Sequence, residues 1–219
     1  MTEFDTVAGS AASAPERGSA TRALLLDVAE ELIGARGLDS VSLREIAAAA
    51  GQRNNSAVRY HFGDKDGLID ALMYDRIGKA EAGRKAMVDR VGDLSSCTAA
   101  ELLEMLWQPL LDLDNGRGSY CFVRFLLGFQ VLTGGHRHPI GADPERHPAS
   151  DAIIRALNAR FSHLSPEQFG YRLSLMAMTF WSAVAMHYHA AIKSNLVWSA
   201  TFSLAESIKL TLGALSVPA

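Results

Sequence analysis

Four polar side chains near residue 55 have the chemistry needed to recognise the edges of DNA bases. They are Arg53, Asn54 and Asn55 in the run GQRNN, and Arg59 a turn further on. Arginine donates two parallel hydrogen bonds to guanine, and asparagine pairs in the same bidentate manner with adenine. For Asn54 an alternative stays open, because asparagine also tolerates the left-handed backbone of a tight turn. Base recognition is favoured for Asn55.

Two short helices joined at Gly51 would have to position these side chains. Ser42 and Glu45 have the spacing of a capping box, so the first helix should start at Ser42. An apolar face then follows at three- and four-residue spacing: Leu43, Ile46, Ala47 and Ala50. Gly51 ends the helix, because glycine adopts the left-handed conformation at little steric cost.

The second helix is expected from Ser56, acting as its cap, through Phe62. Val58 and Phe62 would pack inward and leave the other side free for DNA. Two helices in this arrangement place the second one in the major groove, although an isolated motif could also be an ordinary helical hairpin. The residues predicted to contact DNA are Ser42, Arg44, Arg53, Asn54, Asn55, Ser56, Arg59, Tyr60, His61 and Lys65.

The flanking segments support the DNA-binding interpretation. A helix is expected over residues 21–37, with Leu24, Leu25, Val28, Leu32 and Ile33 as its apolar stripe. Downstream, GDKDGLIDAL predicts a cap at Asp64 and a long helix beginning at Lys65. This three-helix head followed by YHFGDKDGL resembles the tetracycline-repressor (TetR) family of bacterial regulators over roughly residues 20–72.

The resemblance implies a homodimeric, all-helical repressor. Its head would bind a palindromic operator, and its body would bind a small molecule that releases the DNA; activation through the same contacts is the alternative. The family pattern implies that residues 56–62 form the recognition helix and that Lys65 anchors the DNA backbone. Two departures are visible: the turn after Gly51 is one residue longer, and Arg59 stands where a tyrosine is usual, with Tyr60 next.

Length and composition indicate a compact intracellular protein with two domains. The 219 residues are 48% hydrophobic and 21% charged. We expect a disordered tail over residues 1–18, a DNA-binding domain over 19–65 and an effector-binding and dimerisation domain over 66–219. No export signal or transmembrane segment is evident, so a cytoplasmic location without membrane contact is expected. Cys97 and Cys121 lack CxxC spacing, and no cofactor is expected.

The chain as a whole carries no basic excess, with 21 basic and 24 acidic residues, so a positive surface for DNA must be local. Between Ser42 and Lys65 there are four basic and two acidic side chains. A dimer would double this modest positive patch.

The body reads as helix after helix, which predicts an all-α fold of about nine helices. Thr98 with Glu101, and Ser165 with Gln168, have capping spacing, and Ser150 is expected to cap another helix. The body helices are expected at about 65–90, 99–113, 118–132, 150–163, 165–193 and 197–215. The longest loop is expected at 134–148.

The last two helices are apolar enough that a monomer would expose large hydrophobic patches, which predicts a homodimer. One stripe should face the partner and the other the effector pocket, and the sequence leaves open which is which. The predicted interface residues are Ser174, Ala177, Trp181, Ala185, Phe202, Ala205, Ile208 and Leu212.

The effector pocket is expected where large side chains gather in the body, although most of them could equally be core. Arg124, Gln130 and His187 are candidate polar anchors, because an unpaired polar group in an apolar helix is costly. The predicted pocket residues are Trp107, Phe122, Arg124, Phe125, Phe129, Gln130, Met176, Phe180 and His187. They favour an apolar or aromatic small molecule.

Other classes of function are less well supported. His136, His138 and His147 raise the idea of a metal site, but loop histidines without a rigid template are usually solvated, and none is predicted. No GxSxG, P-loop, GxGxxG or HExxH motif is present, so an enzyme is not expected. A helical dimeric scaffold that binds protein and has weakened DNA binding remains the alternative, because of Arg59.

Overall fold

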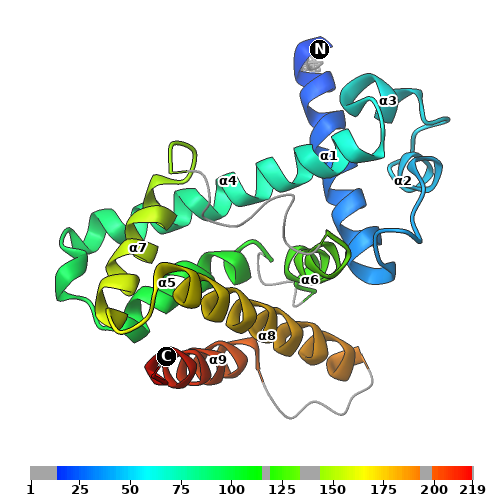
Figure 1. Cartoon of the computed structure of the whole chain (residues 1–219). Helices are drawn as coiled ribbons and strands as arrows, with labels where there is room; N and C mark the ends of the chain where they lie inside the picture. The colour runs from blue at the N-terminus through cyan, green and yellow to red at the C-terminus, as the bar shows by residue number, and fades with distance from the viewer. Residues whose placement is uncertain (1–13, 115–118, 134–143, 193–198, 219) are drawn as a thin grey trace, which may run out of the picture.

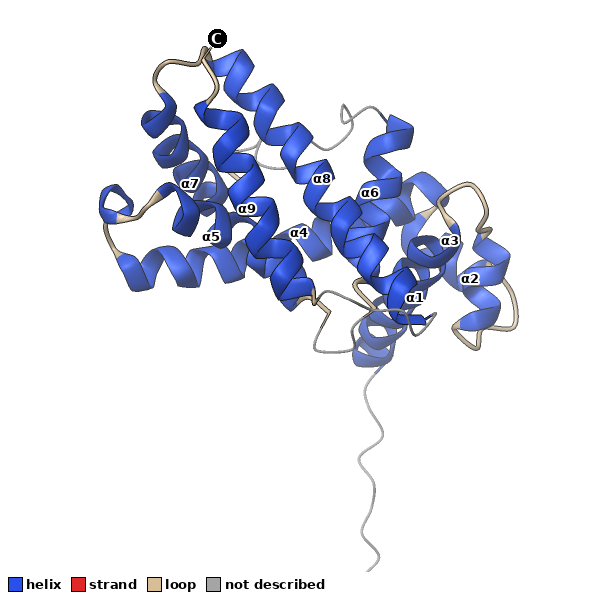
Figure 2. Ribbon diagram, turned by 90° about the horizontal axis from the view of Figure 1, so that it is seen from below, coloured by secondary structure: helices blue, strands red, loops and turns tan. Residues whose placement is uncertain are grey.

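The computed structural model describes residues 14–114, 119–133, 144–192 and 199–218. Over these residues the chain forms nine α-helices and no strand, which confirms the predicted all-α fold (Figure 2). The helices are α1 Ala14–Arg36, α2 Leu43–Ala49, α3 Ser56–Phe62, α4 Lys65–Val91, α5 Ala99–Asp112, α6 Cys121–Thr133, α7 Pro148–Asn158, α8 Pro166–Ile192 and α9 Ala200–Ser216. Two short 3-10 segments, Leu94–Ser96 and Ala159–Phe161, complete them.

Helix α4 runs from the head into the body (Figure 1). At its start it packs against α1 and α3, and further along it packs against α5 and α7. Helices α8 and α9 lie side by side, and α6 packs against α8 while α5 packs against α9. None of the described helices is long and apolar enough to cross a membrane.

The first helix differs from its prediction at its start and in its buried face. It begins at Ala14, before the expected start at residue 21. Leu24 is exposed, whereas Leu26 is buried, so the stripe is rotated by one residue from the predicted one. The reason is that α1 is held on several sides, by α2, α3, α4 and α6, and the three adjacent leucines alone do not define a single face.

Local capping was predicted well where both partners lie in the same turn. The Thr98 hydroxyl accepts the Glu101 N–H at 3.2 Å, and the Glu101 carboxylate accepts the Thr98 N–H at 2.7 Å. Ser165 and Gln168 form the same reciprocal pair at the start of α8. These bonds satisfy backbone donors that would otherwise lack partners at a helix start.

Replacing Thr98 by alanine is expected to lower the free energy of unfolding by about 1 kcal/mol. The Thr98 backbone N–H bond lowers the pKa of Glu101, so its stabilisation is present above the ordinary glutamate pKa and is lost as pH falls through the depressed value. Urea unfolding as a function of pH checks both effects. The control is Ser216→Ala, whose hydroxyl bonds only a carbonyl of its own helix, and a loss as large there would contradict the capping explanation.

Two further helix starts, those of α6 and α7, were not predicted correctly. Helix α6 begins at Cys121 instead of near residue 118, because Tyr120 has a positive φ of 45° that is incompatible with a right-handed helix. Helix α7 begins at Pro148, with His147 before it and Ser150 inside the helix. The predicted cap at Ser150 is therefore wrong.

A carboxylate from α4 performs the capping of α7 instead. The Glu81 Oε1 atom accepts the Ala149 and Ser150 N–H groups at 2.6 and 3.1 Å, and Oε2 accepts the Ser150 hydroxyl. Beside it, the buried Arg84 donates two bonds to the Leu106 carbonyl. Burial lowers the pKa of Arg84 to about 10 although Glu81 counteracts it. This pair joins α4, α5 and α7.

Candidate nucleic-acid interface

The start of α2 is built as its sequence predicts. The Ser42 hydroxyl accepts the Glu45 N–H at 3.2 Å, and the Glu45 carboxylate accepts the Ser42 N–H at 2.9 Å. These bonds to Ser42, together with Arg36 at 3.1 Å, lower the pKa of Glu45. The Ser42 side chain is thus used at the helix start, and the Glu45 charge is offset by Arg36.

The turn into α3 differs from prediction in one respect. Asn55, not Ser56, is the residue before the helix, and its side chain makes no capping bond. Instead the Asn54 side-chain oxygen accepts the Ser56 N–H at 2.9 Å. Because an asparagine two residues before a free N–H readily forms this turn, Asn54 has a structural role in the turn.

Helix α3 covers residues 56–62 as predicted and has a clear inner and outer side. Val58 is fully buried, and Phe62 packs against the same core. The Arg22 guanidinium of α1 lies 5.3 Å from the centre of the Phe62 ring, a contact that holds α3 against α1.

The predicted contact residues mostly lie on the outer side. Tyr60 is 86% exposed. Arg44, Arg53, Asn54, Ser56 and Arg59 are also exposed, while Asn55, His61 and Lys65 are half-buried. Nine of the ten predicted residues are thus wholly or partly exposed, and Ser42, at the start of α2, is exposed as well.

Lys65 has a partner inside the head. Its Nζ donates to the Leu38 carbonyl at 2.6 Å, which ties the start of α4 to the connection between α1 and α2. Asp64 caps α4 by accepting the Gly67 N–H at 2.8 Å, as predicted. The two acidic groups of this region, Glu45 and Asp64, are thus both occupied in helix starts.

The basic groups of the outer side are available to an anion. Among the described residues, no ion pair involves Arg44, Arg53 or Arg59. Exposed, unneutralised arginines beside a projecting tyrosine can bind phosphates and base edges.

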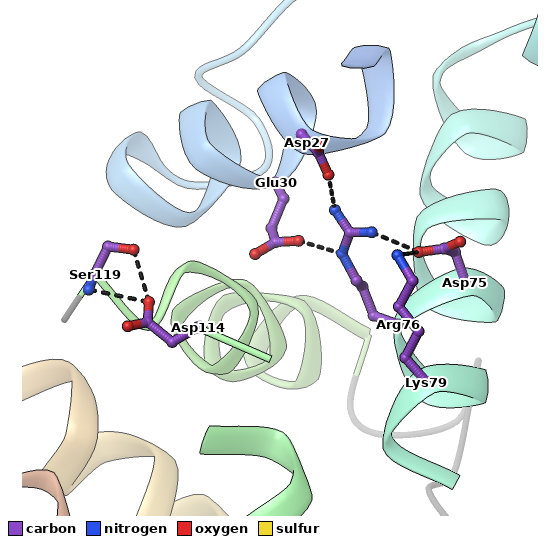
Figure 3. A network of polar contacts seen from close by, with 7 residues as sticks. All are labelled: Asp27, Glu30, Asp75, Arg76, Lys79, Asp114 and Ser119. Carbon is purple, nitrogen blue, oxygen red and sulfur yellow. Dashed lines mark hydrogen bonds and ion pairs between the residues drawn. The ribbon is translucent and has the colours of Figure 1, made fainter. Parts of the chain in front are cut away.

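An ion cluster missed by the sequence analysis fixes the head to α4 (Figure 3). Arg76 Nε donates to Glu30 at 2.5 Å, and the other two nitrogens bond Asp27 and Asp75. Burial opposes the charge of Arg76, but its hydrogen bonds to Glu30 and Asp27 raise its pKa above the ordinary value. The spacing offered a signal, because Arg76 follows buried Leu68 and Leu72 at intervals of four.

The residues predicted to bind an effector gather in the body. Trp107 of α5 stacks on Phe180 of α8 with ring centres 5.1 Å apart, and the ring of Phe125 lies 5.9 and 5.8 Å from those of Phe122 and Phe129. All five rings are buried, as is Arg124, whereas Gln130, Met176 and His187 are half-buried. Two buried side-chain nitrogen atoms of α8, Trp181 Nε1 and His187 Nδ1, have no hydrogen-bond partner among the described residues.

A polar cleft of about 790 Å³ lies elsewhere, between α1, α4 and α5. Its lining includes Asp27, Glu30, Arg76, Lys79 and Asp112, so it borders the ion cluster and contains none of the predicted effector residues.

The predicted dimer residues divide into two groups. Ser174, Phe202 and Ala205 are exposed, and Ala177, Ala185 and Leu212 are half-buried. Trp181 and Ile208, at 4% and 8% exposure, belong to the core of the single chain, so their assignment to a partner surface is wrong. The described residues contain no group of three metal-binding side chains, and His136 and His138 lie outside them.

The family model for bacterial regulatory proteins of the tetR family matches residues 25–72. These residues run from α1 into α4 and include the whole helix-turn-helix. The match confirms the predicted resemblance over the head of the chain. No curated protein matches the chain.

Two solved structures are similar to this chain at low identity. A TetR-family regulator from Streptomyces coelicolor A3 is 18% identical, with a TM-score of 0.43, and the alignment covers 96% of this chain and 100% of that one. A protein assigned to the TetR-family transcriptional regulators, from Rhodococcus sp., is 18% identical, with a TM-score of 0.48 over 91% of this chain and 98% of that one.

Proposed function

We propose that this chain, a transcriptional regulator with a DNA-binding domain of the tetR family, binds an inverted-repeat operator as a homodimer and is released by a small apolar or aromatic molecule. The observation that carries the proposal is the outer side of the helix-turn-helix within residues 25–72. There Arg53, Arg59 and Tyr60 project freely while Val58 and Phe62 hold α3 from behind.

The proposed division of labour follows the helices. Residues 19–65 act as the DNA-binding domain and 66–219 as the effector-binding and dimerisation domain. Helix α4 begins at the end of the DNA-binding domain and continues into the effector-binding domain, so a movement of α4 would transmit a change in the body to the head.

The proposed partner surface lies on the outer sides of α8 and α9. Large apolar side chains remain exposed there: Tyr171, Leu175, Met186, Phe202 and Leu210. Soluble monomers rarely expose such a row, and a second copy of the chain would cover it. Ser174 and Ala205 lie on the same helices and are also exposed. A twofold dimer would place two recognition helices about 34–36 Å apart, one turn of DNA.

Replacing Leu175 and Leu210 by glutamate is expected to dissociate the dimer, because each buried unpaired charge costs about 2–5 kcal/mol. Sedimentation velocity should then report a 23.6 kDa monomer, and operator binding should lose its cooperativity. The control is Val91→Glu, an apolar-to-acidic change at an exposed position at the end of α4. A double variant that stays dimeric would place the partner surface elsewhere.

The aromatic cluster between α5, α6 and α8 supports an apolar or aromatic effector. Trp181 Nε1 can only donate, and leaving it buried and unpaired is costly. An effector with an acceptor atom would gain by pairing with it. Release of DNA then requires that the effector bind more tightly to the state whose heads fit the operator poorly.

Selection of random duplexes by the purified protein, followed by sequencing, tests the proposed function. An inverted repeat with half-sites one helical turn apart is the expected outcome. A folded dimer that enriches no sequence would overturn the proposal and favour a protein-binding scaffold.

A further inference from the structure

The backbone of Tyr120 is held in an unfavourable conformation. Its φ of 45° is the only positive value at a non-glycine residue in the described part of the chain. A bulky residue rarely adopts this conformation unless its surroundings enforce it. Tyr120 lies directly before Cys121, the first residue of α6.

A buried carboxylate supplies the enforcement. Asp114 is 6% exposed, and its Oδ1 atom accepts the Ser119 N–H at 3.0 Å, the Ser119 hydroxyl at 2.8 Å and the Tyr120 N–H at 2.6 Å. Figure 3 shows the bonds between Asp114 and Ser119. Because the Tyr120 N–H is fixed by the shortest of the three, loss of Asp114 would free this residue to rotate to a negative φ.

The first residue of α6 rests directly on the DNA-binding head. A Cβ atom added at Gly34 of α1 would lie 2.7 Å from the Cys121 carbonyl oxygen and 3.3 Å from its Cα. The two backbones therefore touch without an intervening side chain, and no flexible group can absorb a shift of α6. Helices α1 and α6 lie against each other in the fold (Figure 1).

The same turn also touches the body. The Tyr120 ring lies 6.0 Å from the ring of His187 on α8, and His187 Nδ1 has no partner among the described residues. The start of α6 thus contacts α1 of the head through Cys121 and α8 of the body through Tyr120.

We propose that Asp114 is a positioning residue for the DNA-binding head: it holds Tyr120 in the left-handed conformation and so sets where α6 meets Gly34 of α1. The proposal rests on the proposed function only where operator affinity is measured, because the contact between α6 and α1 exists without DNA. When the hold of Asp114 is lost, Tyr120 relaxes, the Cys121 carbonyl moves, and α1 moves with it.

The first test compares Asp114→Ala with Asp93→Ala. Asp93 is the control for losing a carboxylate that binds a serine: it also accepts the N–H and hydroxyl of a following serine, Ser95, but it is exposed and lies far from the head. Hydrogen exchange without DNA should become about tenfold faster at residues 29–36 of α1 in Asp114→Ala only, and operator affinity should fall by about tenfold. Asp114→Asn, which keeps an acceptor at the same place, should preserve most of both.

The decisive test is rescue by glycine. In Asp114→Ala with Tyr120→Gly, residue 120 adopts a positive φ at little cost, so exchange in α1 and operator affinity should return toward wild type. A general loss of folding would not be reversed in this way. The proposal is overturned if Asp114→Ala matches Asp93→Ala, or if glycine at 120 gives no rescue.

A failure of the proposed function gives a different pattern. Faster exchange in α1 that glycine reverses, in a protein that selects no DNA sequence, would uphold the α6–α1 coupling and reject sequence-specific binding. Normal operator binding with unchanged exchange in Asp114→Ala would reject the coupling alone. If Asp114→Ala does not fold, Asp114→Asn and Tyr120→Gly carry the test: both should keep most of the wild-type protection of α1, and a tenfold faster exchange in either would overturn the proposal.

Discussion

Replacing Arg53 and Arg59 by alanine is expected to weaken operator binding by about 1–3 kcal/mol for each arginine, or roughly 5- to 150-fold. Both side chains are exposed on the outer side of the helix-turn-helix and neither enters an ion pair with a described residue. Removing them should therefore cost little in folding. Fluorescence anisotropy with the selected duplex measures the loss.

Salt dependence separates the two kinds of contact that an arginine can make. Loss of an arginine that contacts a phosphate weakens binding to all duplexes alike and reduces the slope of log K against log salt by about one. Loss of an arginine that contacts a base edge relaxes the sequence preference at one position of the operator. The control is Arg155→Ala, an exposed arginine of α7 paired with Asp151. Unchanged affinity and slope in the double variant would mean that α3 is not the recognition helix.

Much of the head could be predicted because its determinants are local. Ser42 and Glu45 lie three residues apart, as do Asp64 and Gly67, and both form the expected bonds within one turn. Hydrogen bonds of this range depend on residue type and spacing alone. The span of α3 was also predicted, although a bond from the Ser56 N–H to Asn54 takes the place of the expected cap at Ser56.

The errors arise where a distant group outcompetes the local one. Ser150 has the right chemistry for a cap, but Glu81, nearly 70 residues earlier, reaches the free N–H groups of α7. Spacing along the chain contains no trace of this contact. Tyr120 is a similar case, because its φ is enforced by a buried Asp114 and no residue-type preference would place a tyrosine there.

The body shows a second limit of sequence reasoning. An apolar helix packed on two sides has no clean stripe, so Trp181 was assigned to a partner surface although it lies in the core, and the exposed Leu175 was passed over. Periodicity identifies an apolar helix but does not tell which neighbour each side meets. The exposed fractions in the folded chain separate these sides.

Replacing Arg76 by methionine is expected to lower the free energy of unfolding by about 3–5 kcal/mol, because it leaves the buried Glu30 carboxylate without its cation. The guanidinium also joins Asp27 of α1, so the head should loosen from α4. Denaturant unfolding measures the loss. The control is Lys85→Met, whose ion pair with Asp89 is exposed and should contribute about 0–1 kcal/mol.

A double variant tests whether the loss of the Arg76–Glu30 ion pair is the cause. With Glu30→Leu added to Arg76→Met, both charges of this buried pair are absent, and most of the lost stability should return. The pH dependence of stability provides a second check on the ion cluster. Burial opposes the Asp75 charge, but hydrogen bonds from Lys79 and Arg76 lower the pKa of Asp75. Its contribution to stability is therefore present above the ordinary aspartate pKa and is lost as pH falls through the depressed value. If the double variant is no more stable than Arg76→Met, Arg76 stabilises the head by packing and not by charge.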